Sequence, residues 1–372
     1  MGPDLPDLRP LADEVCRLGR AAGLDAVGVA RAGAFAGTRR VLEERKAAGL
    51  HGGMHFTYGD PLRSTEPERV LEGARALVVG ARSYRRAEPA PPGQGPLGRV
   101  ARYSWADEYQ PLRQALSVVA GHLRVEGWET AVLVDDNALV DRAAAHRAGL
   151  GWYGKNTNLL LPGMGSWFVL GSVLTDAPLP ASEGPVEDGC GTCTRCLTAC
   201  PTGALVAPGV LDARRCLAWL LEAPGSFPAE HRAALGGRVY GCDDCQEVCP
   251  PNRALDRREP PPPAGAGDEA WVELVEVLRS SDDELLARFR RWYVPRRQAR
   301  YLRRNALVAL GNVGDGSDPE VVDVLVRFMA DADPLLREHA EWAAGRLGRR
   351  DLVEAAAHAA PPAVTAPTPS RR

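Results

Sequence analysis

The sequence contains no apolar run that approaches the roughly 20 residues needed to cross a bilayer. Its opening residues, MGPDLPDLRPLADEV, lack the basic start and the apolar core of a secretion signal. We therefore expect a cytoplasmic protein with no membrane partner. The chain also has no strong charge excess, because its formal net charge is −3, but such an average can conceal a local nucleic-acid-binding patch.

Cysteine is nearly absent from most of the chain. Eight of the nine cysteines lie between positions 190 and 249. Cys16 stands alone in a helical stretch and is expected to be a small core residue without a functional role. Clustered cysteines in a chain without a secretion signal are unlike a disulfide framework, so they indicate metal binding.

Hydrophobic periodicity predicts an α/β domain in the first half of the chain. Strand patterns at residues 25–30, 75–84 and 130–136 alternate with helical patterns at residues 6–22, 37–48 and 108–126. A loop rich in proline and glycine is predicted at residues 86–98. The alternation favours a layered sheet domain, which we place at residues 1–178.

The rest of the chain divides by composition. Periodicity gives way to short pieces between cysteines, so residues 179–258 are predicted to form a ferredoxin-like domain in which metal bonds replace part of the core. The segment EPPPPAGAGDE, residues 259–269, is too rich in proline and glycine for a regular element and is predicted to be a linker. Residues 359–372 are expected to form a disordered tail.

Helical patterns resume within residues 259–358. LRRNALVALGN and LREHAEWAAGR align at a spacing of 34 residues, which places Ala306 over Ala340 and Gly311 over Gly345. This self-similarity favours a pair of HEAT-like helical repeats. An ordinary helical bundle is the alternative.

The segment CGTCTRCLTACP carries the most specific signal. Cys190, Cys193, Cys196 and Cys200, followed by Pro201, have the C-x2-C-x2-C-x3-C-P spacing of bacterial two-cluster ferredoxins. In that arrangement the first three thiolates bind one 4Fe-4S cluster and the fourth binds the other. A second group of cysteines is therefore required.

The segment GCDDCQEVCP supplies three members of that group, and a lone cysteine in DARRCLAWL can complete it. A pair of zinc sites is the alternative, but zinc does not require this pattern twice. Two neighbouring clusters imply a redox reaction, with electrons passing from a soluble donor to an acceptor held elsewhere in the chain. The crossing rule predicts one cluster on Cys190, Cys193, Cys196 and Cys249 and the other on Cys200, Cys216, Cys242 and Cys245.

A GxGxxG pattern lies upstream of the cysteines, at Gly149, Gly151 and Gly154. It is followed by Lys155, as in a P-loop, but Asn156 stands where Ser or Thr should coordinate magnesium. The glycines also follow a helical pattern rather than a strand. Both departures argue against a nucleotide site.

Asp135 lies at the end of the strand pattern TAVLVDD, where open α/β sheets place their ligands. Asp136 and Asn137 are then predicted to cap the helix that ends near Gly149. The residues alone favour the alternative that Asp135 is only the cap and that Asp136 is an exposed turn residue.

Several segments, in the right order, resemble the epoxyqueuosine reductase family over roughly residues 8–255. They are VDDNALVDRAAAHRAGLGWYGKN, GSWFVLGSVLTD, CGTCTRCLTACPTGAL, DARRCLAWL and RVYGCDDCQEVCPPNR, with HGGMHF and VARYSWADEYQ nearer the amino terminus. The resemblance implies two 4Fe-4S clusters and a cobalamin held base-off between the amino-terminal and ferredoxin-like domains. It also implies a tRNA substrate with a GUN anticodon, whose epoxyqueuosine is reduced to queuosine with loss of water.

Opening an epoxide requires a proton for the leaving oxygen, so an acid with a raised pKa is expected near the substrate. Asp135 matches the family's proton-donor aspartate, whereas Asp141 is expected to make a salt bridge or another structural contact. By their places in the matching segments, the implied cobalamin contacts are Arg63, Ser104, Asn156, Leu170 and Ala218.

Core packing explains Leu170 and Ala218 as well as cobalamin contact does. The chain departs from the family pattern at Glu108-Tyr109-Gln110 and at Asn137-Ala138. These departures affect local cobalamin or substrate contacts, and they leave the cysteines and Asp135 in place.

A basic segment, RFRRWYVPRRQARYLRR at residues 288–304, holds eight arginines with Trp292, Tyr293 and Tyr301 between them. It is a candidate surface for tRNA phosphates, with aromatic groups for stacking. The alternative is a solvated helix face that pairs with the acidic residues at 282–284.

Two other functions fit part of the pattern. A reductive dehalogenase or related corrinoid reductase would use the same cofactors, although the cytoplasmic start and the basic repeats argue against it. A non-catalytic electron-transfer protein would bind the clusters and no corrinoid. For the tRNA-reducing function that the resemblance implies, we expect a monomer.

Overall fold

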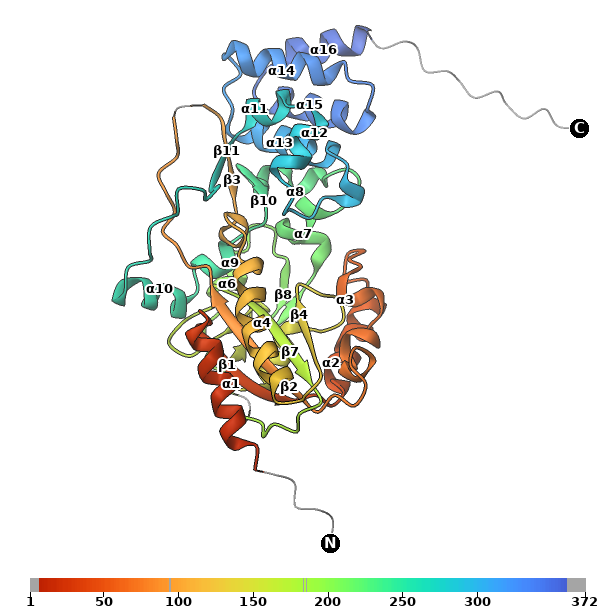
Figure 1. Ribbon diagram of the computed structural model, residues 1–372. Coiled ribbons are helices and arrows are strands. Elements are labelled where there is room, and N and C mark those ends of the chain that lie inside the picture. Colours follow the sequence, from red (N-terminus) through yellow and green to blue (C-terminus); the bar gives the residue numbers. More distant parts are fainter. Residues whose placement is uncertain (1–6, 94, 183, 185, 360–372) are drawn as a thin grey trace, which may run out of the picture.

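The computed structural model describes residues 7–93, 95–182, 184 and 186–359 (Figure 1). A four-stranded sheet of order β1-β2-β7-β4 forms its amino-terminal part. The strands are β1 (Ala26–Arg31), β2 (Ala76–Ser83), β7 (Phe168–Thr175) and β4 (Thr130–Val134). The mixed α/β class is confirmed. Every neighbouring pair is antiparallel, so the ligand-site rule for open parallel sheets does not apply to Asp135.

Helices cover both faces of this sheet because its side chains alternate between two cores. Val27, Val29 and Val78 pack with α1 (Arg9–Ala21) and α4 (Tyr109–Val125). Leu77 and Val79 lie in the opposite core with α5 (Asp141–Arg147). The core of the first domain is therefore two apolar layers separated by the sheet.

Two glycines bring α4 close to the sheet. Gly80 and Gly171 are partners across β2 and β7. A Cβ on Gly80 would lie 3.2 Å from Leu116 of α4, and one on Gly171 would lie 2.8 Å from the same side chain. The absence of a side chain at both positions is what allows the helix to pack at this distance.

The predicted cap of α5 is wrong. The helix begins at Asp141, its N-cap residue is Val140, and no side chain caps it. Asp136 instead accepts a hydrogen bond from the backbone of Ala138 at 2.8 Å, within the turn that follows β4. The Asp136 carboxylate therefore bonds within its own turn and does not cap α5, because a local backbone N–H is the nearer donor.

Shorter elements lie around this domain and in the cysteine-rich region. They are α2 (Ala36–Ala47), α3 (Phe56–Gly59), β5 (Trp152–Tyr153), β6 (Leu159–Leu160), α6 (Arg195–Ala199), β8 (Leu205–Ala207), β9 (Val210–Leu211), α7 (Leu217–Glu222), α8 (Ala229–Leu235), α9 (Asp244–Glu247) and α10 (Pro250–Arg258). The single-turn 3-10 helices are η1 (Arg63–Thr65), η2 (Pro67–Arg69), η3 (Arg102–Ser104), η4 (Ala213–Arg215) and η5 (Pro295–Arg297).

A three-stranded sheet joins segments that are far apart in the chain. Its order is β10 (Arg238–Tyr240), β3 (Leu97–Val100) and β11 (Trp271–Glu273), with β3 parallel to β10 and antiparallel to β11. Residues 259–269 contain no helix or strand, as their composition predicts. Their backbone bonds to the 85–105 segment, where Ala87 N donates to Pro262 O at 2.7 Å.

The carboxyl-terminal helices stack at the end of the molecule farthest from the amino terminus (Figure 1). They are α11 (Leu274–Arg279), α12 (Asp282–Arg288), α13 (Arg300–Val313), α14 (Pro319–Met329), α15 (Pro334–Arg346) and α16 (Arg350–Ala359). Residues 360–372 of the predicted tail lie outside the described part of the chain. Within that part, no helix is both long and apolar enough to cross a membrane.

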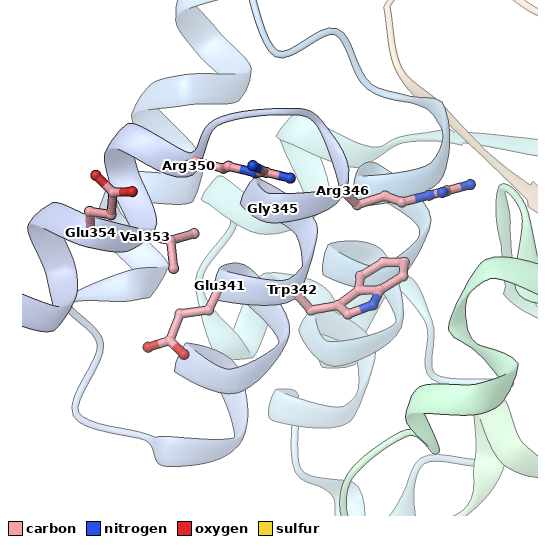
Figure 2. A pocket seen from close by; sticks show the side chains of 7 residues that line it. All are labelled: Glu341, Trp342, Gly345, Arg346, Arg350, Val353 and Glu354. Carbon is pink, nitrogen blue, oxygen red and sulfur yellow. The ribbon is translucent and has the colours of Figure 1, made fainter.

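The two segments that align at the 34-residue spacing are α13 and α15, and they pack together. A Cβ on Gly311 would lie 2.8 Å from the Cα of Ala343. An open hollow of about 420 Å³ lies on α15 and α16, where Trp342 and Arg346 flank it (Figure 2). None of the site residues predicted from the sequence lines this hollow.

Candidate active site

The cysteines of the first motif converge with the last cysteine of the second. Cys190, Cys193, Cys196 and Cys249 line one cavity of about 100 Å³, together with Lys155 and Asn156 of the preceding domain. The spacing rule predicts this grouping, in which the two motifs exchange one cysteine.

The other four cysteines are each half-buried and lie close enough for their charges to act on one another. Burial is the main cause that raises the pKa of Cys216, Cys242 and Cys245. Neighbouring thiols add to this effect, since Cys200 raises the pKa of Cys216, and Cys216 raises that of Cys242 and of Cys245. Bound iron would favour the thiolate form and reverse these shifts.

The cysteine geometry does not match mononuclear zinc. Within the described part of the chain, no three Cys, His, Asp or Glu side chains converge closely enough to hold a single metal ion. Thiolates on one zinc ion sit about 2.3 Å from it and therefore crowd together. Cys190, Cys193, Cys196 and Cys249 instead line a cavity of about 100 Å³, which is larger than one zinc ion requires.

The glycine pattern before the cysteines has a packing role. Gly149 adopts φ +74° just after α5. A Cβ on Gly151 would lie 2.0 Å from the carbonyl oxygen of Leu160, and one on Gly154 would lie 2.3 Å from the Leu160 side chain. The pattern lets β5 and β6 pair closely, which explains it without a nucleotide.

Asp135 follows β4 directly and adopts a left-handed conformation, with φ +51°. Its side chain is exposed, and partial desolvation by the surrounding protein is the main cause that raises the pKa of its carboxyl. The positive charge of Arg113 opposes the shift, and that guanidinium also donates to the carbonyl of Val134 at 2.7 Å. A strained residue with an acid of raised pKa is typical of a functional site.

Asp141 lies on the same loop and helix start, and it does not make the expected salt bridge. Its Oδ1 is buried and has no hydrogen-bond partner within the described part of the chain. Burial raises the pKa of Asp141 well above its usual range, and the charge of Asp135 adds to the shift. Burial therefore favours the protonated form of the Asp141 carboxyl.

Sequence reasoning missed a second acid, Glu222 at the end of α7. Tyr103 donates a hydrogen bond to it at 3.1 Å. Burial raises the pKa of Glu222 to about 7, although hydrogen bonding to Tyr103 and Tyr240 lowers it and Asp135 raises it further. Tyr109 lies among these groups, since burial and then the charges of Asp135, Asp141 and Glu222 raise its pKa.

The five implied cobalamin contacts come from separate elements. Arg63 is exposed on η1, and the next residue, Ser64, donates to the carbonyl of Asn137 at 2.8 Å, so η1 lies against the Asp135 loop. Leu170 is buried on β7 beside Gly171, the partner of Val134. These contacts bring Arg63 and Leu170 toward Asp135.

The remaining three lie nearer the cysteines and the tyrosines. Ser104 is buried on η3, next to Tyr103, and donates to the carbonyl of Ala101 at 3.2 Å. Asn156 is buried and borders the first cysteine cavity. Ala218 is half-buried on α7, two residues after Cys216.

A larger cavity of about 450 Å³ lies beside the Asp135 loop. It is bordered by α2, by α3 and the segment before it, and by the start of α5. Arg142, one of its lining residues, donates to the carbonyl of Thr157 at 2.9 Å. The Nδ1 atom of His51, another lining residue, is buried without a partner within the described chain. The cavity therefore offers mixed apolar and polar groups to a ligand.

Only part of the basic segment at residues 288–304 is exposed to solvent. Trp292 and Tyr301 are buried, and Trp292 stacks on Tyr240 and Phe289 with ring centroids 4.3 Å and 4.1 Å away. Two of the three proposed stacking groups are therefore core residues, and only Tyr293 is exposed.

The arginines divide in the same way. Arg304 is fully buried, Arg303 pairs with Asp282, and Arg300 pairs with Asp333 at 2.6 Å. Arg290, Arg291, Arg296 and Arg297 are exposed. The candidate nucleic-acid surface is thus restricted to residues 290–297, where Arg296 and Arg297 adopt φ of +51° and +52°.

The fold and the cysteines define an iron-sulfur protein of the double-cluster class. Residues 189–252 match the family model described as a 4Fe-4S double cluster binding domain. The chain is 32% identical over 359 residues to the epoxyqueuosine reductase of Bacillus anthracis, which covers 94% of this chain and 92% of the relative.

Solved structures agree along nearly the whole chain. A crystal structure of epoxyqueuosine reductase with a tRNA-Tyr epoxyqueuosine-modified stem loop matches with a TM-score of 0.84 and 31% identity, covering 95% of each chain. The Bacillus subtilis enzyme, with a catalytic aspartate loop swung out of its active site, matches with the same values. The chain belongs to the epoxyqueuosine reductase family.

Proposed function

We propose that this chain reduces epoxyqueuosine to queuosine in tRNA. The observation that carries the proposal is the near-complete structural match to an epoxyqueuosine reductase in contact with its epoxyqueuosine-modified tRNA stem loop. The chain supplies the required chemistry, with two groups of cysteines for electron transfer and a strained acid, Asp135, on an exposed loop.

Cys190, Cys193, Cys196 and Cys249 hold one 4Fe-4S cluster in this proposal. Cys200, Cys216, Cys242 and Cys245 hold the other. The cavity shared by the first set and the mutual pKa effects within the second set support this division.

Cobalamin is assigned to the region between the Asp135 loop and the cysteine groups. The 450 Å³ cavity adjoins this region and offers Arg142 and the unpartnered His51 Nδ1 for polar contact, although none of the five implied cobalamin contacts lines it. We assign Arg63, Ser104, Asn156, Leu170 and Ala218 to the surrounding contacts. Bound there, the corrinoid would supply the reduction at carbon, while the chain binds the substrate and provides protons.

Asp135 is the proton donor to the epoxide oxygen in this account. Desolvation keeps a larger fraction of its carboxyl protonated than an ordinary aspartate would have, and its position after β4 exposes it to a bound substrate. Asp141 lies on the same loop and helix start, and burial raises the pKa of its carboxyl well above the usual range, which disfavours a second negative charge near the anionic tRNA backbone.

Each of the three proposed domains has its own role in this proposal. Residues 1–178 bind cobalamin and carry the acid, residues 179–258 carry the clusters, and residues 259–358 form HEAT-like repeats in which α13 and α14 are followed by α15 and α16. The exposed arginines at 290–297 contact tRNA phosphates. The protein works as a cytoplasmic monomer that receives electrons from a soluble donor.

The test is reconstitution without oxygen, with iron, sulfide and cobalamin, followed by reductant and epoxyqueuosine-containing tRNA. Nucleosides are read by mass spectrometry, and cobalamin is omitted from a matched sample. Conversion to queuosine only in the complete sample supports the proposal. If cobalamin binds and the tRNA is unchanged, the substrate assignment is wrong; if cobalamin does not bind, an electron carrier is the better interpretation.

A further inference from the structure

Tyr293 is the exposed aromatic residue within the arginine-rich surface at residues 290–297. Its side chain is 41% exposed, whereas the flanking Trp292 and Val294 are buried. Within the described part of the chain, Tyr153 is the only other aromatic residue among the exposed large apolar side chains, and it lines the 450 Å³ cavity. Tyr293 is therefore the aromatic ring that this basic surface offers to a partner.

The backbone around Tyr293 is held by bonds from distant and local groups. Its N–H donates to the Tyr240 hydroxyl at 2.8 Å. The guanidinium of Arg297 donates to the carbonyl oxygens of Trp292 at 3.2 Å and of Leu286 at 2.8 Å. Because Arg297 itself has a φ of +52°, these bonds maintain a strained turn beside the ring. The position of Tyr293 is thus fixed before any ligand binds, which lowers the entropic cost of binding.

A second aromatic ring reaches Tyr293 from the amino-terminal half of the chain. The ring centroid of Phe56, in α3, lies 5.2 Å from that of Tyr293, and the two planes meet at 64°. Phe56 also makes an edge contact with Trp219 of α7, at 6.0 Å and 78°. Within the described residues, neither Tyr293 nor Phe56 has a parallel-stacked ring partner. The exposed Tyr293 ring can therefore still stack on a flat ligand.

Trp219 connects this pair of rings to the proposed active site. Its Nε1 donates to the carbonyl oxygen of Gly52 at 2.8 Å. Gly52 has a φ of +60°, and a Cβ there would lie 3.0 Å from the same nitrogen, so glycine permits the close approach of this segment to α7. Trp219 follows Ala218, one of the assigned cobalamin contacts. Two ring contacts thus connect Tyr293 to the proposed cofactor region.

The charges around Tyr293 favour an anionic ligand. Exposed arginines of residues 290–297 flank the ring in the sequence. Within the described part of the chain, the ion pairs of the basic segment are made by Arg288, Arg300 and Arg303, which leaves the charge of these exposed arginines available. Cations beside an exposed aromatic ring are typical of single-stranded nucleic-acid sites, where phosphates bind the cations and a base stacks on the ring.

We propose that Tyr293 and Phe56 form a stacking site for an unpaired base of the tRNA anticodon loop, next to the modified nucleoside. The inference rests on the proposed function. Tyr293 stacks on the base, Phe56 supports the Tyr293 ring, and the arginines bind the adjacent phosphates. Because every base has a flat face, this site selects an unstacked nucleotide rather than a sequence. Its occupation directs the neighbouring modified nucleoside toward α7.

The experiment is a double-mutant cycle between protein and RNA, with binding of epoxyqueuosine stem loops titrated at constant salt. Two further stem loops each lack one base, on one side or the other of the modified nucleoside. Tyr293→Leu should bind the intact stem loop about tenfold more weakly than the wild type does. One of the two abasic stem loops should bind the wild type about tenfold more weakly and show no further loss with Tyr293→Leu. Tyr293→Phe, which keeps the ring, should recover tight binding.

Phe56→Leu should give a smaller loss with the same coupling to the abasic stem loop. Val326→Ala, an exposed change on α14, should match the wild type. Wild-type affinity in Tyr293→Leu, or independent losses from Tyr293→Leu and from both abasic stem loops, overturns the inference. Should Phe56→Leu fail to fold, the Tyr293→Leu cycle alone decides. A coupled cycle in a holoenzyme that leaves epoxyqueuosine unreduced supports the stacking site and counts against the proposed function.

Discussion

Asn156 donates from Nδ2 to the carbonyl oxygen of Cys245 at 3.3 Å. Its Oδ1 accepts from the backbone of Asn158 at 3.2 Å, and the side chain is 4% exposed. One buried amide therefore fixes both the loop after β5 and the peptide of a cysteine in the second motif. This contact therefore links the segment after β5 to the cysteine-rich region.

Asn156→Ala should destabilise the protein by about 2 kcal/mol, because it leaves a buried carbonyl and a buried N–H without partners. The change is measured as a lower apparent Tm and as less iron retained per chain after reconstitution. Asn137→Ala removes an exposed amide from the neighbouring loop and serves as the control. Equal Tm and iron content in the two variants would show that the Asn156 contacts do not contribute to stability or to iron retention.

Gly151→Ala should cost about 2 kcal/mol or more in the free energy of unfolding, because the new Cβ would overlap the Leu160 carbonyl oxygen. Gly121→Ala is the matched control, since nothing lies within 4 Å of its added Cβ in α4. That variant should be neutral or slightly stabilised. Thermal melts compare the two, and a Gly151→Ala melt no lower than the control would contradict the packing role.

Arg290→Gln and Arg296→Gln should each weaken tRNA binding while kcat stays unchanged. Each lost phosphate contact should also lower the slope of log affinity against log salt by about 0.7 to 0.9. Arg124→Gln removes an exposed arginine from α4 and should leave both quantities unchanged. Binding of a tRNA stem loop, titrated at several salt concentrations, is the measurement. Wild-type slopes in both variants would exclude residues 290–297 as the tRNA surface.

Ionisation of Glu222 should make the free energy of unfolding depend on pH. Its folded pKa, about 7, is above the ordinary value of 4.5, so folding favours the protonated carboxyl. This contribution is complete near pH 4 and is lost as the pH rises to about 7, a change of about 3 kcal/mol. Glu222→Gln cannot ionise, so its Tm should exceed that of the wild type increasingly as the pH rises to 7. A Tm difference that is independent of pH would contradict the shifted pKa.

The parts of the site that could be predicted are those encoded by local spacing. The x2-x2-x3 pattern places three cysteines on one short turn, so the position of Cys190, Cys193 and Cys196 around one cavity could be predicted from the chain alone. The strands β1, β2 and β4 likewise lie within a residue or two of their predicted ranges, because alternation with a buried face is a local signal.

Features that depend on distant contacts could not be predicted. β3 lies partly within a segment whose composition indicates a loop, and it becomes a strand only by pairing with β10 and β11. Glu222 resembles any surface glutamate at a helix end, because its raised pKa comes from tertiary burial. The prediction that Trp292 stacks on tRNA is wrong for the same reason, because distant contacts with Tyr240 and Phe289 make it a core residue.

The most direct test of the account is turnover of Asp135→Asn, measured by mass spectrometry of tRNA nucleosides after anaerobic reconstitution with iron, sulfide and cobalamin. We expect wild-type cluster and cobalamin absorbance, and formation of queuosine slower on the order of 100-fold or more. Asp13→Asn, an exposed change on α1, should convert the tRNA at the wild-type rate. Full activity in Asp135→Asn would remove this residue as the acid and contradict the central claim.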